Sequence, residues 1–254
     1  MSTFPDQFRL DGRTALVTGS GRGLGWEMAR ALAEAGARVL LHGRAAERLA
    51  GRVGELRQAG RAADAVVFDM ADRPAMRQAL AGTGPIDVLI HNVGERDRRP
   101  FDQIEPEDFA RLIDVDLAAA HALVKLVVPG MIERGWGRLI LVTSIAGQLA
   151  VPGASSYIAA KGGLAALARA LAAELGAKGI TTNALSPGFF ATETNEKMMA
   201  SPMGERQRER CPAKRWAQPS EIAGAALFLA SPAASYVNGH TLVVDGGVSA
   251  TYLS

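Results

Sequence analysis

The feature that most constrains the fold is a cluster of glycines that follows a short apolar run near the N-terminus. The run at 14–18 leads into Thr18-Gly-Ser-Gly-Arg-Gly-Leu-Gly25, and residues 24–35 then carry apolar side chains at helical spacing. Because glycine has no Cβ, this backbone can turn tightly and approach a pyrophosphate, which meets the free N–H groups of the helix. A glycine-rich turn without a ligand is the alternative, but the place between a strand and a helix predicts a dinucleotide-binding unit.

The rest of the chain repeats this alternation of short apolar runs and longer amphipathic ones. Predicted strands cover residues 14–18, 38–42, 65–68, 86–90, 139–143, 180–185 and 241–244. Predicted helices cover residues 24–35, 45–58, 73–80, 109–134, 155–177 and 220–230. Gly36 and Gly60 are expected C-caps. The pattern predicts one α/β domain over 1–254, of the Rossmann-type doubly wound class, with a seven-stranded parallel sheet and helices on both faces.

One segment interrupts this rhythm. Residues 192–218 are mostly polar, include Met198, Met199, Met203 and Trp216, and contain no expected strand. A long insertion near the end of an α/β sheet is often a substrate loop, so we expect a lid here, with a surface excursion of no function as the alternative.

Composition excludes several classes of function. The chain has 254 residues, 48% of them hydrophobic, and 28 basic against 26 acidic side chains, so no nucleic-acid partner is expected. No signal peptide or charge-free membrane span is expected either. The single cysteine, Cys211, is expected to be structural and fits a reducing compartment, which predicts a cytoplasmic protein.

The end of the second predicted strand indicates which dinucleotide is preferred. An NAD-binding unit usually has an acid about twenty residues past the glycine loop, but this chain has Arg44 there, and Arg22 lies within the loop. Two guanidinium groups suit a 2′-phosphate, which an acid would repel. We therefore expect NADP(H) as the cofactor; the alternative is that both arginines are solvated surface charges.

Three further side chains suggest acid/base chemistry at the nicotinamide. Tyr157 and Lys161 are four residues apart in a predicted helix and so share a face, and Ser144 stands at the end of the fifth predicted strand. The phenol of tyrosine has an ordinary pKa near 10, which a nearby ammonium lowers. We expect Tyr157 to exchange the proton and Ser144 to orient the substrate oxygen.

With these motifs the chain resembles the short-chain dehydrogenase/reductase family over residues 14–247. The matching pieces are the glycine loop, Asn92-Val-Gly94, Ser144, Tyr157-Ile-Ala-Ala-Lys161, Ser186-Pro-Gly188 with Thr192, and Asp245-Gly-Gly247. The resemblance implies cofactor contacts from Gly19, Ser20, Arg22, Gly23, Leu24, Gly25, Arg44, Asp69, Met70, Asn92, Gly94, Tyr157, Lys161, Pro187, Gly188, Phe190 and Thr192, with no metal. It also implies a homotetramer, built through helices at 103–134 and 155–177.

The chain departs from the family pattern at two positions. His91 replaces an asparagine after the fourth predicted strand, where we expect a tolerated substitution. Asp116 occupies the position of a catalytic asparagine that helps hold a water beside the family's lysine. We expect Asp116 to belong to the catalytic set and activity to be retained. A catalytically weakened NADP-binding sensor or scaffold is the alternative of another class.

The substrate is indicated more weakly. The charged run 95–100, together with 187–192, 212–216 and 237–240, is similar to sugar-acid dehydrogenases of the gluconate 5-dehydrogenase type, and its arginines could bind a carboxylate. A 3-oxoacyl thioester or a broad range of ketones is the alternative. We expect the pocket to include Ile145, Gln148, Val151, Phe189, Phe190 and part of 193–216, an apolar set that fits a sugar acid less well.

Overall fold

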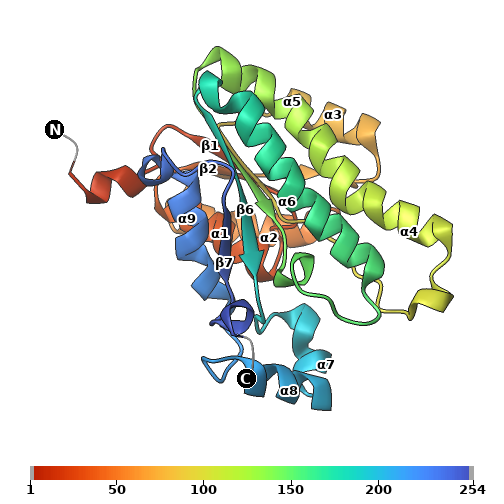
Figure 1. The fold of residues 1–254 in the computed structure, drawn as a ribbon. Helices are drawn as coiled ribbons and strands as arrows, with labels where there is room; N and C mark the ends of the chain where they lie inside the picture. Colours follow the sequence, from red (N-terminus) through yellow and green to blue (C-terminus); the bar gives the residue numbers. More distant parts are fainter. Residues whose placement is uncertain (1–2, 252–254) are drawn as a thin grey trace.

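A parallel sheet with helices packed on both faces forms the molecule (Figure 1). The computed structural model describes residues 3–251. The strands are β1 (Thr14–Val17), β2 (Arg38–Gly43), β3 (Ala63–Val67), β4 (Val88–His91), β5 (Gly137–Val142), β6 (Ile180–Pro187) and β7 (Thr241–Val244), in the spatial order β3-β2-β1-β4-β5-β6-β7. Every strand pair is parallel, and the order reverses between β1 and β4. This confirms the predicted doubly wound, seven-stranded sheet.

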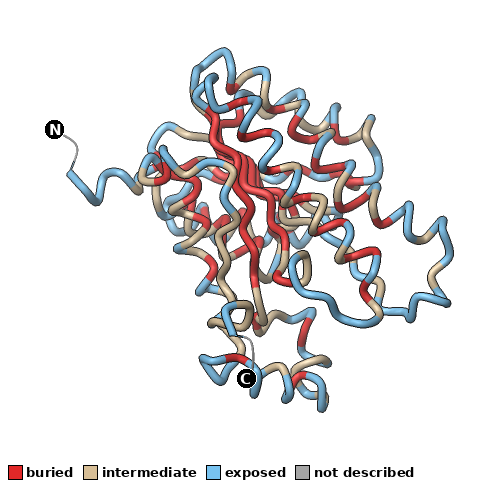
Figure 2. The backbone as a smooth tube through the Cα atoms, viewed as in Figure 1, coloured by how far each residue is buried: buried red, intermediate tan, exposed pale blue. Residues whose placement is uncertain are grey.

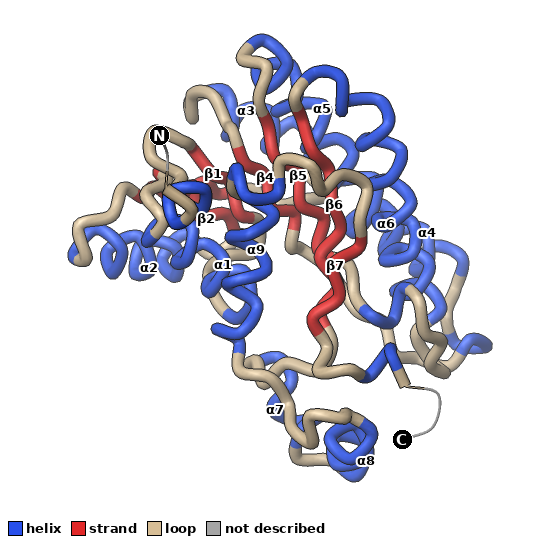
Figure 3. The backbone as a smooth tube through the Cα atoms, turned by 60° about the vertical axis from the view of Figure 1, so that its left-hand side comes forward, coloured by secondary structure: helices blue, strands red, loops and turns tan. Residues whose placement is uncertain are grey.

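Most of the helices divide between the two faces of the sheet, while α7 and α8 lie beyond its end, as Figure 3 shows. Their bounds are α1 (Gly23–Glu34), α2 (Ala46–Gln58), α3 (Arg73–Ala81), α4 (Pro106–Ile113), α5 (Ala119–Glu133), α6 (Ser155–Leu175), α7 (Glu196–Met199), α8 (Pro202–Arg210) and α9 (Ala223–Ala230). One core joins α1, α2 and α9 to the sheet, and the other joins α3, α5 and α6 to its opposite face. Side chains alternate along β2 between these cores, with Val39 and Leu41 in the first and Leu40 in the second.

Burial follows the sheet, and its central strands are buried along their whole length (Figure 2). The apolar, β-branched runs produce this pattern because a parallel strand covered by helices on both faces has no solvated side. Gly36 and Gly60 follow the ends of α1 and α2 with φ of 106° and 72°, which confirms them as C-terminal caps.

Two segments differ from expectation. The helix predicted over 109–134 begins at Pro106 and changes to a π-helical turn at Asp114–Ala118, between α4 and α5. A period of 3.6 residues cannot reveal this turn because the apolar spacing continues on either side of it. The 192–218 segment has no strand but folds into α7 and α8, at the bottom of Figure 1, and Phe190 and Ala217 form an isolated bridge across its base.

The continuous helical stretch Pro106–Glu133 is long and apolar enough, by length and composition, to cross a membrane. Half of its most apolar window is buried inside the fold, where α5 packs on the sheet. Core helices of this kind pass the same test as membrane spans, so the stretch is weak evidence for a membrane location.

Candidate active site

A cavity of about 540 Å³ opens at the carboxyl ends of the central strands, beside the switch point between β1 and β4. Ligands of doubly wound sheets bind at this place. The predicted cofactor residues that line it are Gly19, Arg22, Gly23, Leu24, Gly25, Arg44, Asp69, Met70, Asn92, Gly94, Tyr157, Lys161, Pro187, Gly188, Phe190 and Thr192. Ser20 lies outside the lining: it is fully buried, and its hydroxyl accepts the N–H of His42 at 3.0 Å.

The glycine loop wraps closely around the end of β1. Gly19 and Gly23 have φ of 64° and 55°, a region that favours glycine, and a Cβ on Gly25 would lie 2.3 Å from the carbonyl oxygen of Gly19. Asn92, after β4, donates from its amide to the Thr18 carbonyl at 3.1 Å, and its N–H donates to the Thr18 hydroxyl at 2.8 Å. These contacts fix the loop beside the N-terminus of α1, whose free N–H groups can bind an anion.

His42 also lines this end of the cavity. The sequence did not predict it as a site residue because it lies within a predicted buried strand. Its Nδ1 accepts the N–H of Gly19 at 3.3 Å, and its Nε2 lies 3.1 Å from the Phe68 carbonyl. Burial lowers the pKa of His42 to about 4, so the ring is neutral at pH 7. A neutral ring can accept at one nitrogen and donate at the other, which suits both contacts.

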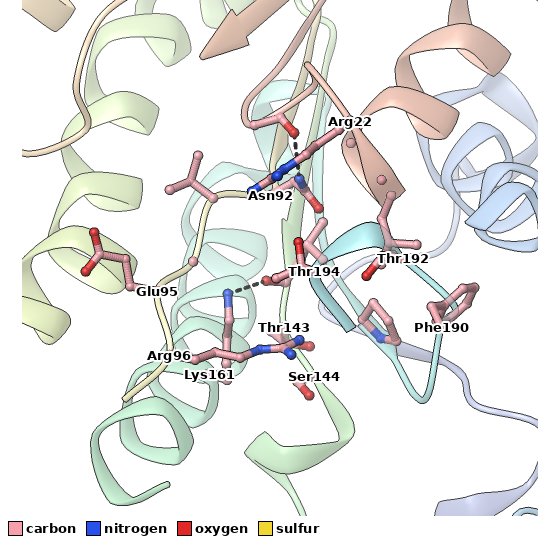
Figure 4. A pocket seen from close by; sticks show the side chains of 18 of the residues that line it. Arg22, Asn92, Glu95, Arg96, Thr143, Ser144, Lys161, Phe190, Thr192 and Thr194 are labelled. Atoms are coloured by element: carbon pink, nitrogen blue, oxygen red, sulfur yellow. Dashed lines mark hydrogen bonds between the residues drawn. The ribbon is translucent and has the colours of Figure 1, made fainter. Parts of the chain in front are cut away.

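Two arginines lie at the mouth of the same end. The Arg44 guanidinium is 3.3 Å from the Asp69 carboxylate, and Arg22 is 3.9 Å from Glu193. Both arginine side chains are largely exposed, so these pairs bind weakly and leave the guanidinium groups accessible. Figure 4 shows Arg22 above Asn92 at the rim of the cavity.

At the other end, Ser144, Tyr157 and Lys161 meet as the spacing predicted. The ammonium of Lys161 is buried, donates to the Val142 carbonyl at 3.1 Å and lies 5.7 Å from the centroid of the Tyr157 ring. Ser144 caps a short turn after β5, and its hydroxyl accepts the N–H of Ala146 at 3.2 Å.

Arg96 joins these three residues. Its guanidinium lies 5.3 Å from the centroid of the Tyr157 ring and donates to the Asn195 amide oxygen at 3.1 Å, so it bridges the loop after β4 and the 192–218 segment. Figure 4 shows it reaching across the cavity toward Ser144. The charged run marked Arg96 in the sequence as a possible anion contact, but its place over Tyr157 depends on a loop conformation that no periodicity indicates.

These neighbours determine the acidity of Tyr157. Burial acts to raise the pKa of the phenol, whereas the charges of Lys161 and Arg96 and hydrogen bonding to Ser144 and Arg96 lower it. The net effect is a pKa below the usual value near 10. This direction favours the phenolate, which is the form that can accept a proton.

The far end of the cavity is lined by a different set of residues from the one expected. Of the expected pocket residues only Phe190 lines it, joined by Thr194 and Asn195 of the 193–216 segment; Ile145, Gln148, Val151 and Phe189 do not. Phe189 instead packs against Trp216, with ring centroids 5.5 Å apart. The lining also includes Glu95, Arg96, Thr143 and Ser144. Four of the expected pocket residues therefore lie outside this cavity, and the substrate pocket itself stays a prediction.

Asp116 and His91 lie behind the cavity wall and are fully buried. Asp116 accepts the N–H of Glu95 at 2.7 Å through Oδ1. His91 makes no hydrogen bond through either ring nitrogen within the described part of the chain, and burial, with the charge of Lys161, lowers its pKa to about 3. Within residues 3–251 no group of three or more His, Cys, Asp or Glu side chains could hold a metal ion.

Several known proteins are similar to this chain in sequence and in structure. The family model described as enoyl-(acyl carrier protein) reductase matches residues 19–249. Gluconate 5-dehydrogenase of Gluconobacter oxydans is 39% identical over 250 residues, covering 96% of this chain and 98% of that protein. Galactitol 2-dehydrogenase of Cereibacter sphaeroides is 41% identical, covering 94% and 96%. The crystal structure of a gluconate 5-dehydrogenase from Burkholderia cenocepacia, in complex with NADP and tartrate, has a TM-score of 0.92 and 42% identity, covering 97% and 98%.

The sheet order, the glycine loop and the position of the cavity are those of a nicotinamide-dependent oxidoreductase. The chain belongs to the short-chain dehydrogenase/reductase family, whose members act on CH–OH and carbonyl groups.

Proposed function

We propose that this enzyme interconverts a secondary alcohol and a ketone on a sugar acid, of the gluconate/5-keto-gluconate type, with NADP(H). The observation that carries the proposal is the position of Tyr157 between two cations, Lys161 and Arg96, beside the Ser144 hydroxyl. The charge of Lys161 lowers the pKa of the Tyr157 phenol, which favours proton transfer there. Arg96 is a cation at the substrate end of the cavity with no carboxylate partner among residues 3–251.

The residues divide the work of alcohol oxidation. The glycine loop, Lys161 and Thr192 line the space that would hold NADP⁺, and the cofactor when bound would supply the hydride acceptor for the carbinol carbon. Tyr157, as phenolate, accepts the hydroxyl proton, while the Ser144 hydroxyl bonds the same oxygen and holds it beside the ring. Lys161 stabilises the phenolate by its charge. In the reverse reaction Tyr157 returns the proton, so reduction needs the phenol and weakens as pH rises through its pKa.

The choice of NADP(H) rests on Arg44 and Arg22. Both guanidinium groups are exposed at the rim of the glycine loop, where a 2′-phosphate could replace Asp69 and Glu193 as their partners. The related gluconate 5-dehydrogenase structure holds NADP, which supports this choice. Removing Arg44 is expected to raise the KM for NADPH at least tenfold and to leave the KM for NADH nearly unchanged.

A carboxylate on the substrate is the natural ligand for Arg96. A guanidinium can bind it through two parallel hydrogen bonds, with Thr194 and Asn195 within the same polar lining. Two similar proteins are named for gluconate, and one of them is in complex with tartrate, a dicarboxylate. Galactitol 2-dehydrogenase is equally similar, however, and its name gives a polyol without an acid group. A polyol is therefore the second candidate substrate.

The test measures oxidation of NADPH and of NADH with 5-keto-gluconate, a polyol-derived ketose, a 3-oxoacyl thioester and aryl ketones. Turnover of 5-keto-gluconate with NADPH is expected, with a loss of at least a thousandfold in Tyr157→Phe. Arg96→Gln is expected to raise the KM for 5-keto-gluconate at least tenfold and to change the KM for the uncharged ketose little. Another preferred substrate would replace the sugar-acid assignment. Tight NADPH binding with no turnover of any compound would instead support the sensor alternative.

Three further properties belong to the proposal. We assign the enzyme to the cytoplasm, since its single cysteine, Cys211, is buried and unpaired within the described residues.

We assign residues 192–218 the role of a lid. Thr192, Thr194 and Asn195 line the cavity, and the Asn195 amide oxygen accepts a hydrogen bond from Arg96 across it. We assign the assembly as a homotetramer through the outer faces of α4–α5 and α6.

A further inference from the structure

Asp116 lies where the α4–α5 helix loses its regular pitch. The π-helical turn Asp114–Ala118 widens the helix by one residue, and such turns often occur at functional sites. The side chain of Asp116 is fully buried there, although a carboxylate is costly to bury without partners. Its two oxygens make different contacts.

One oxygen fixes a loop and the other faces a charge. Oδ1 accepts the N–H of Glu95 at 2.7 Å, directly before Arg96 in the chain. Oδ2 makes no hydrogen bond within residues 3–251. A Cβ built on Gly94 would lie 3.2 Å from Oδ2 and 2.7 Å from the Nζ of Lys161. The carboxylate and the ammonium therefore lie on the same side of Gly94, next to each other behind the wall of the site.

Four charged or titratable side chains surround Asp116, and each comes from a different segment of the fold. Lys161 approaches from α6, Glu95 from the loop after β4, Arg111 from α4, and His91 from β4. Burial raises the pKa of Asp116, while Lys161, the Glu95 N–H and Arg111 act to lower it and the Glu95 charge acts to raise it. Glu95 is itself paired with Arg111 at 2.5 Å, which reduces its influence.

We propose that Asp116 is a positioning residue with two actions. Its buried carboxylate anchors the loop that carries Glu95 and Arg96. The same carboxylate opposes the charge of Lys161 and thereby sets the pH at which the Tyr157 phenol loses its proton. This inference rests on the proposed role of Tyr157. A negative charge near Lys161 counteracts the stabilisation that the ammonium gives to the phenolate. An asparagine at this position would keep an oxygen for the Glu95 N–H but would carry no charge.

The two actions are separable by substitution. Asp116→Asn retains the hydrogen-bond acceptor and removes the charge, whereas Asp116→Ala removes both. Asp114→Asn is the matched control, because Asp114 lies on the same turn, is exposed, and pairs with Arg73 at 2.8 Å away from the cavity.

The first readout is the titration of the Tyr157 phenol, followed by ultraviolet absorbance as the difference between each variant and the same variant carrying Tyr157→Phe, with NADP⁺ bound. We expect the midpoint in Asp116→Asn to move to lower pH by roughly half a unit to one unit. Asp116→Ala should move in the same direction, and Asp114→Asn should titrate with the wild type. This readout needs no substrate, so it stands even if the sugar-acid assignment fails.

The second readout is the KM for 5-keto-gluconate. Asp116→Ala is expected to raise it about tenfold because the Arg96 loop loses its anchor, and Asp116→Asn is expected to keep it within about twofold. An unchanged midpoint in Asp116→Asn would overturn the electrostatic action, and equal KM values in the two variants would overturn the anchoring action. If Asp116→Ala does not fold, the anchoring action is tested by Asp116→Ser, whose hydroxyl is too short to reach the Glu95 N–H.

Discussion

Buried ionisable side chains gather around the cavity, and each has a consequence for the acid stability of the protein. His91 has no hydrogen bond at either ring nitrogen among the described residues, and burial is the main cause of its pKa of about 3. His42 behaves similarly, with a pKa of about 4. Because these values lie below 6.5, the stability that the neutral rings provide is complete above pH 6.5 and declines as pH falls toward 4 and 3.

His91→Asn should therefore flatten the acid dependence of stability. Between pH 7 and pH 5 the wild type is expected to lose about 2 kcal/mol more unfolding free energy than the variant, because only its unfolded state binds the proton of residue 91 in that range. Urea unfolding at the two pH values measures this difference, whatever the substitution does to stability at pH 7. His121→Asn, at an exposed position, serves as the control. Parallel acid dependence in His91→Asn and the wild type would contradict the prediction.

At the residue scale, helical spacing predicted that three of the proposed catalytic side chains would lie together. Tyr157 and Lys161 share a face because they are four apart on α6, and Ser144 joins them because strand and helix ends meet at one edge of the sheet. The spacing could not show that Ser20 lies outside the cavity, because its hydroxyl turns inward and accepts a hydrogen bond from the backbone of β2. Asp116 was recognised by its position in the family pattern, while its contact with Glu95 depends on the π-helical turn.

At the scale of single elements, the glycine loop and α1 are the most tightly constrained. A Cβ at Gly25 would lie 2.3 Å from the Gly19 carbonyl oxygen and 2.7 Å from the Asn92 amide nitrogen. Gly25→Ala is therefore expected to push the loop away from β1 and weaken NADPH binding at least tenfold. Gly51→Ala is the control, because a Cβ on this residue of α2 has no atom within 4 Å.

Binding of NADPH by fluorescence and thermal unfolding together check this prediction. Gly51→Ala should bind NADPH as the wild type does and gain about 0.5–1 kcal/mol of stability, since alanine favours a helix more than glycine. Gly25→Ala binding NADPH with wild-type affinity would show that the loop can relax without loss of the phosphate site.

Most elements were predictable because apolar periodicity reflects burial on a sheet or a helix face. All seven predicted strands overlap an observed one, and β3 begins two residues earlier than expected, at Ala63. The helices α7 and α8 were not predicted because they are short and polar, and their positions depend on tertiary contacts. Trp216 shows this: its indole donates to the Gly204 carbonyl at 3.2 Å and its ring faces Phe189.

At the scale of the whole molecule, the proposed homotetramer predicts that exposed apolar side chains of α4 and α5 are covered in the assembly. Phe109 on α4 and Ile132 on α5 are large apolar side chains that are 40% and 38% exposed. Sedimentation is expected to give four chains per particle, and Phe109→Glu is expected to shift the population toward smaller species. Phe4→Glu, a substitution of the 71% exposed Phe4 near the N-terminus, should leave it unchanged. A monomer at micromolar concentration would refute the assembly.

The two ends of the cavity differ in how they are built, and this difference bears on how such an enzyme can evolve. The glycine-loop end consists largely of backbone tied to β1 and β4, so most substitutions there disturb the sheet itself. The other end takes Arg96, Ser144 and Asn195 from three separate loops that follow buried strands. Sequence drift in those loops can change the compound accepted while the hydride chemistry and the folding of the sheet are inherited intact.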